Sequence, residues 1–307
     1  MREMKGKLKT KPNLAFKIRS MRLEDIPQIV ELGRQERFQF PASSLKYWLT
    51  QDPDGMKIAV TESGEIIGSL FNIKNNERLY IGGVFCVQEK FRHLDVGRKL
   101  LQACDDHSEG INIGVNTDIH RVGPYMRRGV TVLETDWKSL EYETYTPVNP
   151  AILSDELPSG VEILAFQNSL LPAIYEYDYS LAGYERKSLI EASCHEENSR
   201  TLVAMKDGKC VGFGSIKLNI MEIGRIGPLY TDDPSVAEAM VKRLIPAMPE
   251  AKGFTTVTIN TNLYANMVLE KLKIPIHSSL YRLYREERFH VDTKRVFAHF
   301  DIDFTPV

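Results

Sequence analysis

The sequence is poor in cysteine and has no long apolar run. Its four cysteines, Cys86, Cys104, Cys194 and Cys210, lie far apart and form no CxxC pair. We therefore expect neither a disulfide framework nor a zinc site, and we expect a cytoplasmic protein with reduced thiols. No apolar stretch reaches the roughly 18 residues that a membrane span requires, and no apolar signal-peptide core follows the first residues. We expect no metal and no membrane partner.

An excess of charge of one sign is also missing. The chain has 39 Lys and Arg against 41 Asp and Glu, a formal net charge of -2. Since no overall field attracts an anionic partner, we expect no nucleic acid. The biased segment is the start, MREMKGKLKTK, where five basic residues accompany a single acid. We interpret residues 1–14 as a disordered basic tail.

The amino-acid composition suits two globular domains. Hydrophobic residues make up 43% of the 307 residues, enough for two cores of ordinary size. Strand and helix patterns alternate from residue 16, and the end, KRVFAHFDIDF, is compatible with one more strand. The stretch 146–160 holds three prolines and little periodicity. We interpret it as a linker between domains 15–145 and 161–307.

The two halves repeat one pattern of landmarks. Five of them recur 144 residues later: Gly64 at Gly208, Gly68 at Gly212, Gly83 at Gly227, Asp118 at Asn262, and the segment from Tyr125 at the segment from Leu269. Any two mixed folds share hairpins and amphipathic helices, but that does not explain a register without gaps. The constant spacing indicates an internal duplication.

The copies differ at the stretch FRHLDVGRKLL, residues 91–101. A short loop with Gly97 runs directly into an amphipathic helix, whose first amides and partial positive charge suit a phosphate. The paired glycines Gly82 and Gly83 in the strand before it indicate a bulge or a close ligand. The counterpart, residues 235–245, reads SVAEAMVKRLI, has no glycine and predicts uninterrupted helix. The alternative is that the first copy has only a surface turn here.

This loop resembles the pyrophosphate loop of the GNAT acyltransferases, which transfer acyl groups from coenzyme A thioesters to amines. The residues that fit the pattern Q/R-x-x-G-x-G/A and its flanks are Arg92, Val96, Gly97, Leu100 and Leu101, while His93 and Asp95 stand where the family prefers glycine. The downstream family pattern N-x-x-A-x-x-L-Y-E-R-x-G-F fits the first half at Asp118, Tyr125, Arg127, Gly129 and Val130. The second copy fits the same pattern but has Leu269 at the position of the tyrosine. The second half resembles a GNAT subgroup found C-terminal to a first GNAT domain. The residues that carry this resemblance are Asp178, Gly183, Arg186 and the segment IGPLYTDD.

The resemblance implies a fold and a cofactor. The fold class is α/β (α+β), with two tandem GNAT folds that are each a mixed, mostly antiparallel sheet flanked by helices, the second without the pyrophosphate loop. The cofactor is acetyl-CoA. The implied cofactor-binding residues are Phe85, Cys86, Val87, Arg92, His93, Leu94, Asp95, Val96, Gly97, Arg98 and Asp118. The Asp95 carboxylate would repel a pyrophosphate by about 1 kcal/mol at ~4 Å in water, and Arg92, Arg98 and Lys99 would offset it.

The resemblance also implies catalytic roles. Tyr125 stands where the family's tyrosine protonates the departing thiolate, although a tyrosine that only packs a helix remains an alternative. The strand residues 80–87 contain no carboxylate, so the nearest candidate base is His120, with Glu77 behind it. A histidine at a helix start is also typical of a solvated capping residue. Cys86 is compatible with a covalent route, but a buried structural cysteine is the simpler interpretation.

Three functions are compatible with these patterns. The first is an acetyl-CoA-dependent N-acetyltransferase acting on a small-molecule or peptide amine by direct attack. The second is an inactive GNAT-like protein that binds acyl-CoA or another ligand, and the third is a structural or interaction module. The acids Glu176, Asp178 and Glu185 are compatible with a site for a cationic amine or with a solvated helix face. The sequence is compatible with a monomer or a homodimer.

Overall fold

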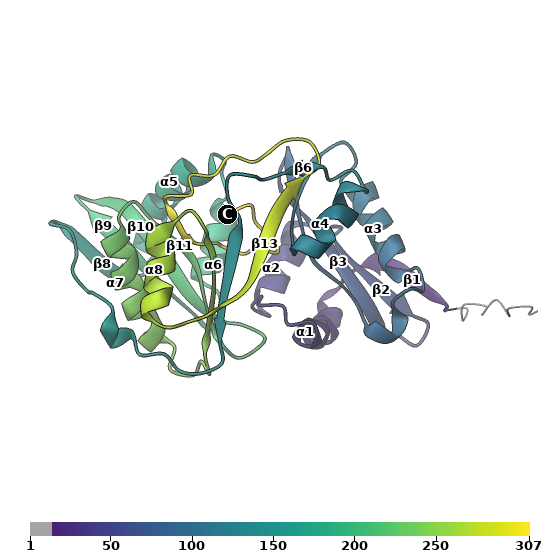
Figure 1. Ribbon diagram of the computed structural model, residues 1–307, viewed down its shortest axis with the longest axis horizontal. Coiled ribbons are helices and arrows are strands. Elements are labelled where there is room, and N and C mark those ends of the chain that lie inside the picture. The colour runs from purple at the N-terminus through teal and green to yellow at the C-terminus, as the bar shows by residue number, and fades with distance from the viewer. Residues whose placement is uncertain (1–13) are drawn as a thin grey trace, which may run out of the picture.

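The computed structural model describes residues 14–307, which form one mixed sheet with helices on both faces (Figure 1). The predicted basic tail falls outside the described residues, except for Leu14. The strands of the first half are β1 (Phe16–Ser20), β2 (Met56–Thr61), β3 (Ile66–Asn76), β4 (Leu79–Val87), β5 (Asn112–Thr117), β6 (Val132–Leu133) and β7 (Ser139–Thr144). Those of the second half are β8 (Val161–Ala165), β9 (Ser199–Lys206), β10 (Lys209–Leu218), β11 (Gly224–Thr231), β12 (Phe254–Ile259), β13 (Ile276–Tyr284) and β14 (Val296–Ala298).

Helices cover both faces of this sheet. They are α1 (Ile26–Gln35), α2 (Ser44–Gln51), α3 (Val96–His107), α4 (Ile119–Met126), α5 (Leu171–Ala182), α6 (Lys187–Cys194), α7 (Pro234–Leu244) and α8 (Leu263–Lys271). Because side chains alternate along a strand, β3 serves two cores. Its Leu70 packs beneath α3 with Val96 and Leu100, whereas Phe71 packs on the other face with Trp48 of α2. The predicted mixed α/β class is confirmed.

The two halves exchange strands in the middle of the sheet. The order of the main path is β1-β2-β3-β4-β5-β13-β7-β12-β11-β10-β9-β8. Strand β13 of the second half pairs with β5 of the first, and β7 of the first half pairs with β12 of the second. Figure 1 shows β13 lying at the centre of the molecule. The segment 146–160 joins β7 to β8, but the sheet is not divided there.

The repeated landmarks hold equivalent places in the two halves. The order β3, β4, α3, β5, α4 recurs as β10, β11, α7, β12, α8. Asp118 caps α4 by accepting from a backbone N–H, and its counterpart Asn262 caps α8 in the same way. Gly64 and Gly208 both have a left-handed backbone, with φ of +85° and +75°, in the hairpin turns.

The C-terminal segment runs through the interior between the halves. Strand β14 is shorter than the sequence pattern suggested, and residues 299–307 continue without regular strand structure. Phe304 and Val307 are 0% and 1% exposed, and Phe304 stacks on Trp48 of α2 with ring centroids 5.4 Å apart. The C-terminus therefore lies in the middle of the molecule, as Figure 1 shows.

Candidate functional site

The loop that precedes α3 has the backbone shape that glycine would favour. His93 and Asp95, which stand at two glycine positions of the family pattern, both have φ of +68°. A left-handed backbone costs a residue with a side chain roughly 1–2 kcal/mol. Asp95 is the N-cap residue of α3, and the helix begins at Val96. The turn predicted from the sequence is therefore formed, with two strained residues in place of glycines.

The basic residues around this loop are partly neutralised by acids. Arg92 binds Glu36 at the end of α1 through two hydrogen bonds of 2.8 and 3.1 Å. Arg98 forms an ion pair with Asp95 at 3.0 Å. Both pairs are at least partly exposed, so an incoming anion can compete for the arginines. The positive charge expected to offset Asp95 is smaller than the sequence suggested.

A gap opens between β4 and β5 directly below the loop. The parallel pairing of these strands ends at Gly82 and Val115. The ladder between β3 and β4 shifts at the next residues, and Val84 there has φ of +50°. This is the predicted bulge, displaced to Val84 and Phe85. Phe85 faces α3, where a Cβ on Gly97 would lie 3.3 Å from its ring, so Gly97 allows the helix to approach the strand.

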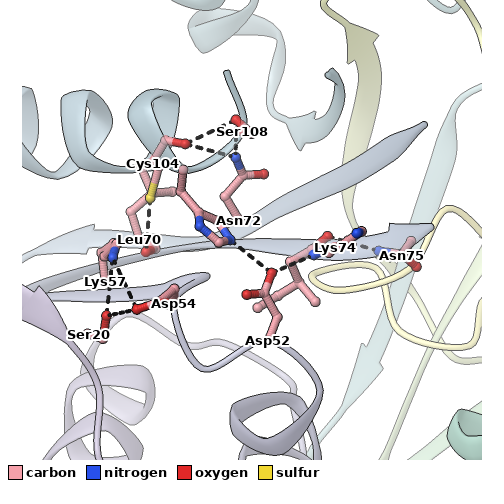
Figure 2. Close-up of polar contacts among 12 residues, drawn as sticks. Ser20, Asp52, Asp54, Lys57, Leu70, Asn72, Lys74, Asn75, Cys104 and Ser108 are labelled. Carbon is pink, nitrogen blue, oxygen red and sulfur yellow. Dashed lines mark hydrogen bonds and ion pairs between the residues drawn. The ribbon is translucent and has the colours of Figure 1, made fainter. Parts of the chain in front are cut away.

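A small apolar cavity of about 40 Å³ lies beneath α3 and α4, beside this gap. Its lining residues are Leu70, Phe71, Asn72, Gly82, Leu101, Cys104, Asp105, Ile113, Val115, Tyr125, Arg128 and Val130. Burial raises the pKa of Tyr125, so its phenol stays protonated at neutral pH and is able to donate a proton. Figure 2 shows the wall formed by β3 and α3, where the Asn72 amide nitrogen donates to the Ser108 hydroxyl at 2.8 Å.

The oxygen of the same Asn72 amide has no hydrogen-bond partner among the described residues, although the side chain is 2% exposed. The volume of the cavity holds about one water molecule. A coenzyme A arm would therefore have to widen the gap as it enters, and it would meet an unpaired acceptor in this wall.

Three candidate site residues lie away from this cavity. His120 is exposed on α4, and its backbone N–H donates to Asp118 at 2.9 Å. Because five residues correspond to about 140° around a helix, His120 points away from the cavity that Tyr125 lines. The Asp118 side chain caps α4 and pairs with Arg121 at 3.3 Å, which accounts for its position without a ligand. Glu77 pairs with Lys74 at the far end of β4.

The cysteines are unpaired and buried or half-buried. Burial raises the pKa of the Cys86 thiol to about 12, and its sulfur lies 3.3 Å from the Ser69 hydroxyl. The thiol is therefore not a thiolate at neutral pH, which favours the structural interpretation. Among residues 14–307, no group of three His, Cys, Asp or Glu side chains could hold a metal ion. Within the same residues no helix is both long and apolar enough to cross a membrane.

The equivalent gap of the second half is filled by the chain itself. Strand β14 pairs with β11, and the N–H of the following residue, His299, donates to Val257 of β12. The corresponding cavity is about 10 Å³ and is lined in part by Phe297, Ala298 and Leu269. Helix α7 begins at Pro234, so the place of the phosphate loop is helical, as predicted.

The C-terminal segment also reaches the gap of the first half. The backbone oxygen of Asp303 would lie 2.2 Å from a Cβ on Gly83, so only glycine allows this approach. On the other side of the gap, the Asn116 amide of β5 donates to the Ile302 carbonyl at 2.7 Å. The close neighbour that the two glycines suggested is the protein's own chain. No local sequence pattern marks this contact, because 220 residues separate its two sides.

Structural roles explain the three residues of the second half that carry its GNAT resemblance, Asp178, Gly183 and Arg186. Arg186 donates to both oxygens of Asp178, at 2.7 and 2.8 Å, and both side chains are buried. Gly183 ends α5 with φ of +75°, the left-handed conformation common at helix C-termini. Asp178 is thus committed to this ion pair. A surface hollow of about 630 Å³ beside it includes Glu176 and Glu185.

Comparison with known proteins agrees with this architecture. Residues 174–298 match the family model described as "Acetyltransferase (GNAT) domain", and this range lies wholly within the second half. No curated protein matches the sequence. A solved structure of a candidate acetyltransferase from Pyrococcus horikoshii is similar, with 18% identity and a TM-score of 0.73 over 96% of this chain and 99% of that chain.

Two further solved structures show the same likeness. One is a GCN5-related N-acetyltransferase from Sphaerobacter thermophilus, with 13% identity and a TM-score of 0.59 over 94% of this chain and 98% of that chain. The other is a tandem GNAT protein from the clavulanic acid biosynthesis pathway, with 10% identity and a TM-score of 0.61 over 88% and 98%. Residues 174–298 therefore match a GNAT domain model, and the chain as a whole has the fold seen in these solved structures, one of which is a tandem GNAT protein. The resemblance to the GNAT family inferred from the sequence is confirmed by the family model in the second half and by the fold of the whole chain.

Proposed function

We propose that the protein is an acetyl-CoA-dependent N-acetyltransferase whose active site lies in the first half. The observation that carries the proposal is the loop at residues 92–95, which retains a left-handed backbone at both glycine positions and leads into the N-terminus of α3. The amides of Val96, Gly97 and Arg98 would hold the pyrophosphate of the cofactor. The arm of the cofactor would enter the gap between β4 and β5 and lie along residues 85–87 of β4.

The chemistry is direct transfer from the thioester to an amine. The amine nitrogen attacks the thioester carbon, a backbone N–H of β4 stabilises the oxygen as charge develops, and the carbon–sulfur bond breaks. The departing sulfur takes a proton from the Tyr125 phenol, whose pKa burial has raised. The high pKa of Cys86 favours this route over one through a cysteine thioester. The acceptor is a small-molecule or peptide amine.

The second half has a supporting role in this proposal. Its gap holds β14, its phosphate loop is replaced by the start of α7, and Leu269 stands where the first half has Tyr125. It supplies β13 to the sheet of the first half. We expect it to bind no acetyl-CoA.

A second candidate, an inactive protein that binds acyl-CoA, is favoured by the absence of a carboxylate from residues 80–87 of β4. The ion pairs of Arg92 with Glu36 and of Arg98 with Asp95 weaken the attraction for a pyrophosphate, which favours the interaction module instead. The two candidates differ in turnover, and the third interpretation, an interaction module, differs from both in cofactor binding.

Titration and turnover separate these functions. Calorimetric titration with acetyl-CoA comes first, because no heat at millimolar ligand would leave only the interaction module. Free thiol released with a panel of amines then tests transfer. The Tyr125→Phe variant should keep its affinity for acetyl-CoA and lose about 10²-fold or more in turnover. Unchanged turnover would remove Tyr125 from the mechanism, and thiol release by neither protein would favour the inactive binder.

A further inference from the structure

We propose that Asp303, carried by the C-terminal segment, accepts the proton from the acceptor amine. This assignment rests on the transferase function proposed above. It supplies the base that the sequence of β4 lacks, since residues 80–87 contain no carboxylate. It also places a residue of the second half in the active site of the first.

The C-terminal segment brings Asp303 to the gap between β4 and β5. Its backbone touches Gly83 on β4 and is held by Asn116 on β5, at the point where these strands have ceased to pair. The Val84 N–H at the bulge lies close enough to the Asp303 carboxylate to act on its pKa. The segment lies on the face of β4 that carries α1 and α2, because Phe304 packs with Trp48, whereas the loop and α3 lie on the opposite face. Asp303 and the cofactor site therefore meet at the same gap from opposite faces.

Asp303 is the least buried residue of the segment 296–307. Residues 296–302 and 304–307 are buried, whereas Asp303 is partly exposed. Packing fixes the segment on both sides of the carboxylate, so the side chain is held in place and still accessible to a substrate. A residue whose only role was to fill the core would have no reason to be ionisable at this position.

The surroundings of Asp303 suit a base that works near neutral pH. Burial and the neighbouring Asp301 raise its pKa to about 7, against the opposing effects of Arg225 on β11 and the Val84 N–H. Glu141 on β7 acts in the same direction as Asp301. A carboxylate with an ordinary pKa near 4 would be a weaker base for an ammonium group.

The transfer step balances with these two groups. Asp303 takes a proton from the ammonium form of the acceptor, and the free amine attacks the thioester carbon. The carbon–sulfur bond breaks, and the thiolate takes a proton from Tyr125. After the attack the nitrogen carries one proton too many for an amide, and this second proton replaces the one that Tyr125 gave to the thiolate. The proton on Asp303 is released to solvent. No oxidant, reductant or further reactant is needed.

The decisive experiment compares two small amines with Asp303→Asn. Methylamine is an ammonium ion at pH 7.5 and needs a base, whereas hydroxylamine is largely neutral at that pH. Acetyl-CoA binding is measured first, and we expect the variant to bind within about twofold of the natural protein. Thiol release should then fall about 10²-fold or more with methylamine and much less with hydroxylamine.

Asp301→Asn is the matched control on the same segment. It removes a buried charge but keeps an oxygen that can accept from the Asp303 N–H, a bond of 3.2 Å. This variant should keep its affinity for acetyl-CoA, and the ascending limb of its pH–rate profile should move to lower pH, because the charge that raises the Asp303 pKa is gone.

Four outcomes would overturn the assignment. Unchanged turnover of Asp303→Asn with methylamine, or equal losses with both amines, would show that Asp303 is not the base. If the natural protein binds acetyl-CoA but releases no thiol with either amine or with the panel, the proposed transfer itself is wrong and the assignment goes with it. Loss of acetyl-CoA binding in Asp303→Asn alone would assign the residue to structure instead.

Discussion

At the scale of single residues, the phosphate loop has a left-handed backbone, which glycine favours, at two positions that other residues occupy. His93 and Asp95 keep the left-handed backbone although neither is glycine. Arg92, just before them, donates to the Val87 carbonyl of β4 at 3.0 Å. The sequence was sufficient to locate the loop, but it could not show that Arg92 and Arg98 are engaged by acids, because Glu36 lies 56 residues away from Arg92.

We predict that Asp95→Gly tightens acetyl-CoA binding. The change removes a negative charge beside the expected pyrophosphate, worth about 1 kcal/mol, and it frees Arg98. Affinity measured by calorimetry should rise by about fivefold. The matched variant His93→Gly relieves backbone strain without removing a carboxylate, so its affinity should stay within about twofold. Equal gains in both variants would attribute the effect to strain instead of charge.

We predict that Asp303 makes the stability of the protein fall as the pH rises. Its pKa is raised from about 4 in an unfolded chain to about 7, so the folded state favours the protonated form. This preference is fully present below pH 4 and is lost between pH 4 and about 7. Urea unfolding at pH 5 and pH 8 should show Asp303→Asn gaining stability over the natural protein at the higher pH. An identical difference at both values would contradict the raised pKa.

At the scale of elements, β14 distinguishes the two halves. It pairs with β11, and its Phe297 and Ala298 line the cavity beneath α7 and α8, whereas in the first half the backbone of Asp303 meets β4 at Gly83 without strand pairing. The strands, the hairpins and the caps of α4 and α8 were predictable, because each is encoded by neighbouring residues such as Asp118 and Asn262. The pairing of β14 with the open edge of β11 was not predictable from the sequence, because β14 lies about 65 residues further along the chain.

We predict that Phe297→Ala destabilises the protein without creating a second cofactor site. Phe297 is 4% exposed, and loss of a buried phenyl group costs about 3–5 kcal/mol. Urea unfolding should show this loss, whereas Leu263→Ala, at a position 68% exposed, should change stability by less than about 0.5 kcal/mol. Because α7 still replaces the loop, the number of acetyl-CoA molecules bound per chain should not rise. A second bound molecule would refute the role assigned to β14.

At the scale of the whole molecule, the exchanged strands make the halves interdependent. The sequence predicted two copies and a linker at 146–160, and the copies are present. It could not predict that β13 completes the first sheet and β7 the second, because both copies have the same local pattern. The same exchange brings the C-terminus to the centre and Asp303 to the gap of the first half.

We predict that the two halves unfold in one transition and that residues 1–160 do not fold alone. Such a fragment lacks β13, whose Arg282, Leu283 and Tyr284 are all 0% exposed in the complete chain. The fragment would leave the edge of β5 unpaired and the core around Leu283 open. Circular dichroism with thermal melting should show no cooperative transition for the fragment. A sharp transition would mean that the halves are independent.

The most direct test of the central claim is a calorimetric titration of the intact protein with acetyl-CoA. One molecule per chain is predicted, with an affinity that rises in Asp95→Gly and is unchanged in Phe297→Ala. No binding at millimolar ligand, or binding of two molecules per chain, would contradict the assignment of a single cofactor site to the loop before α3.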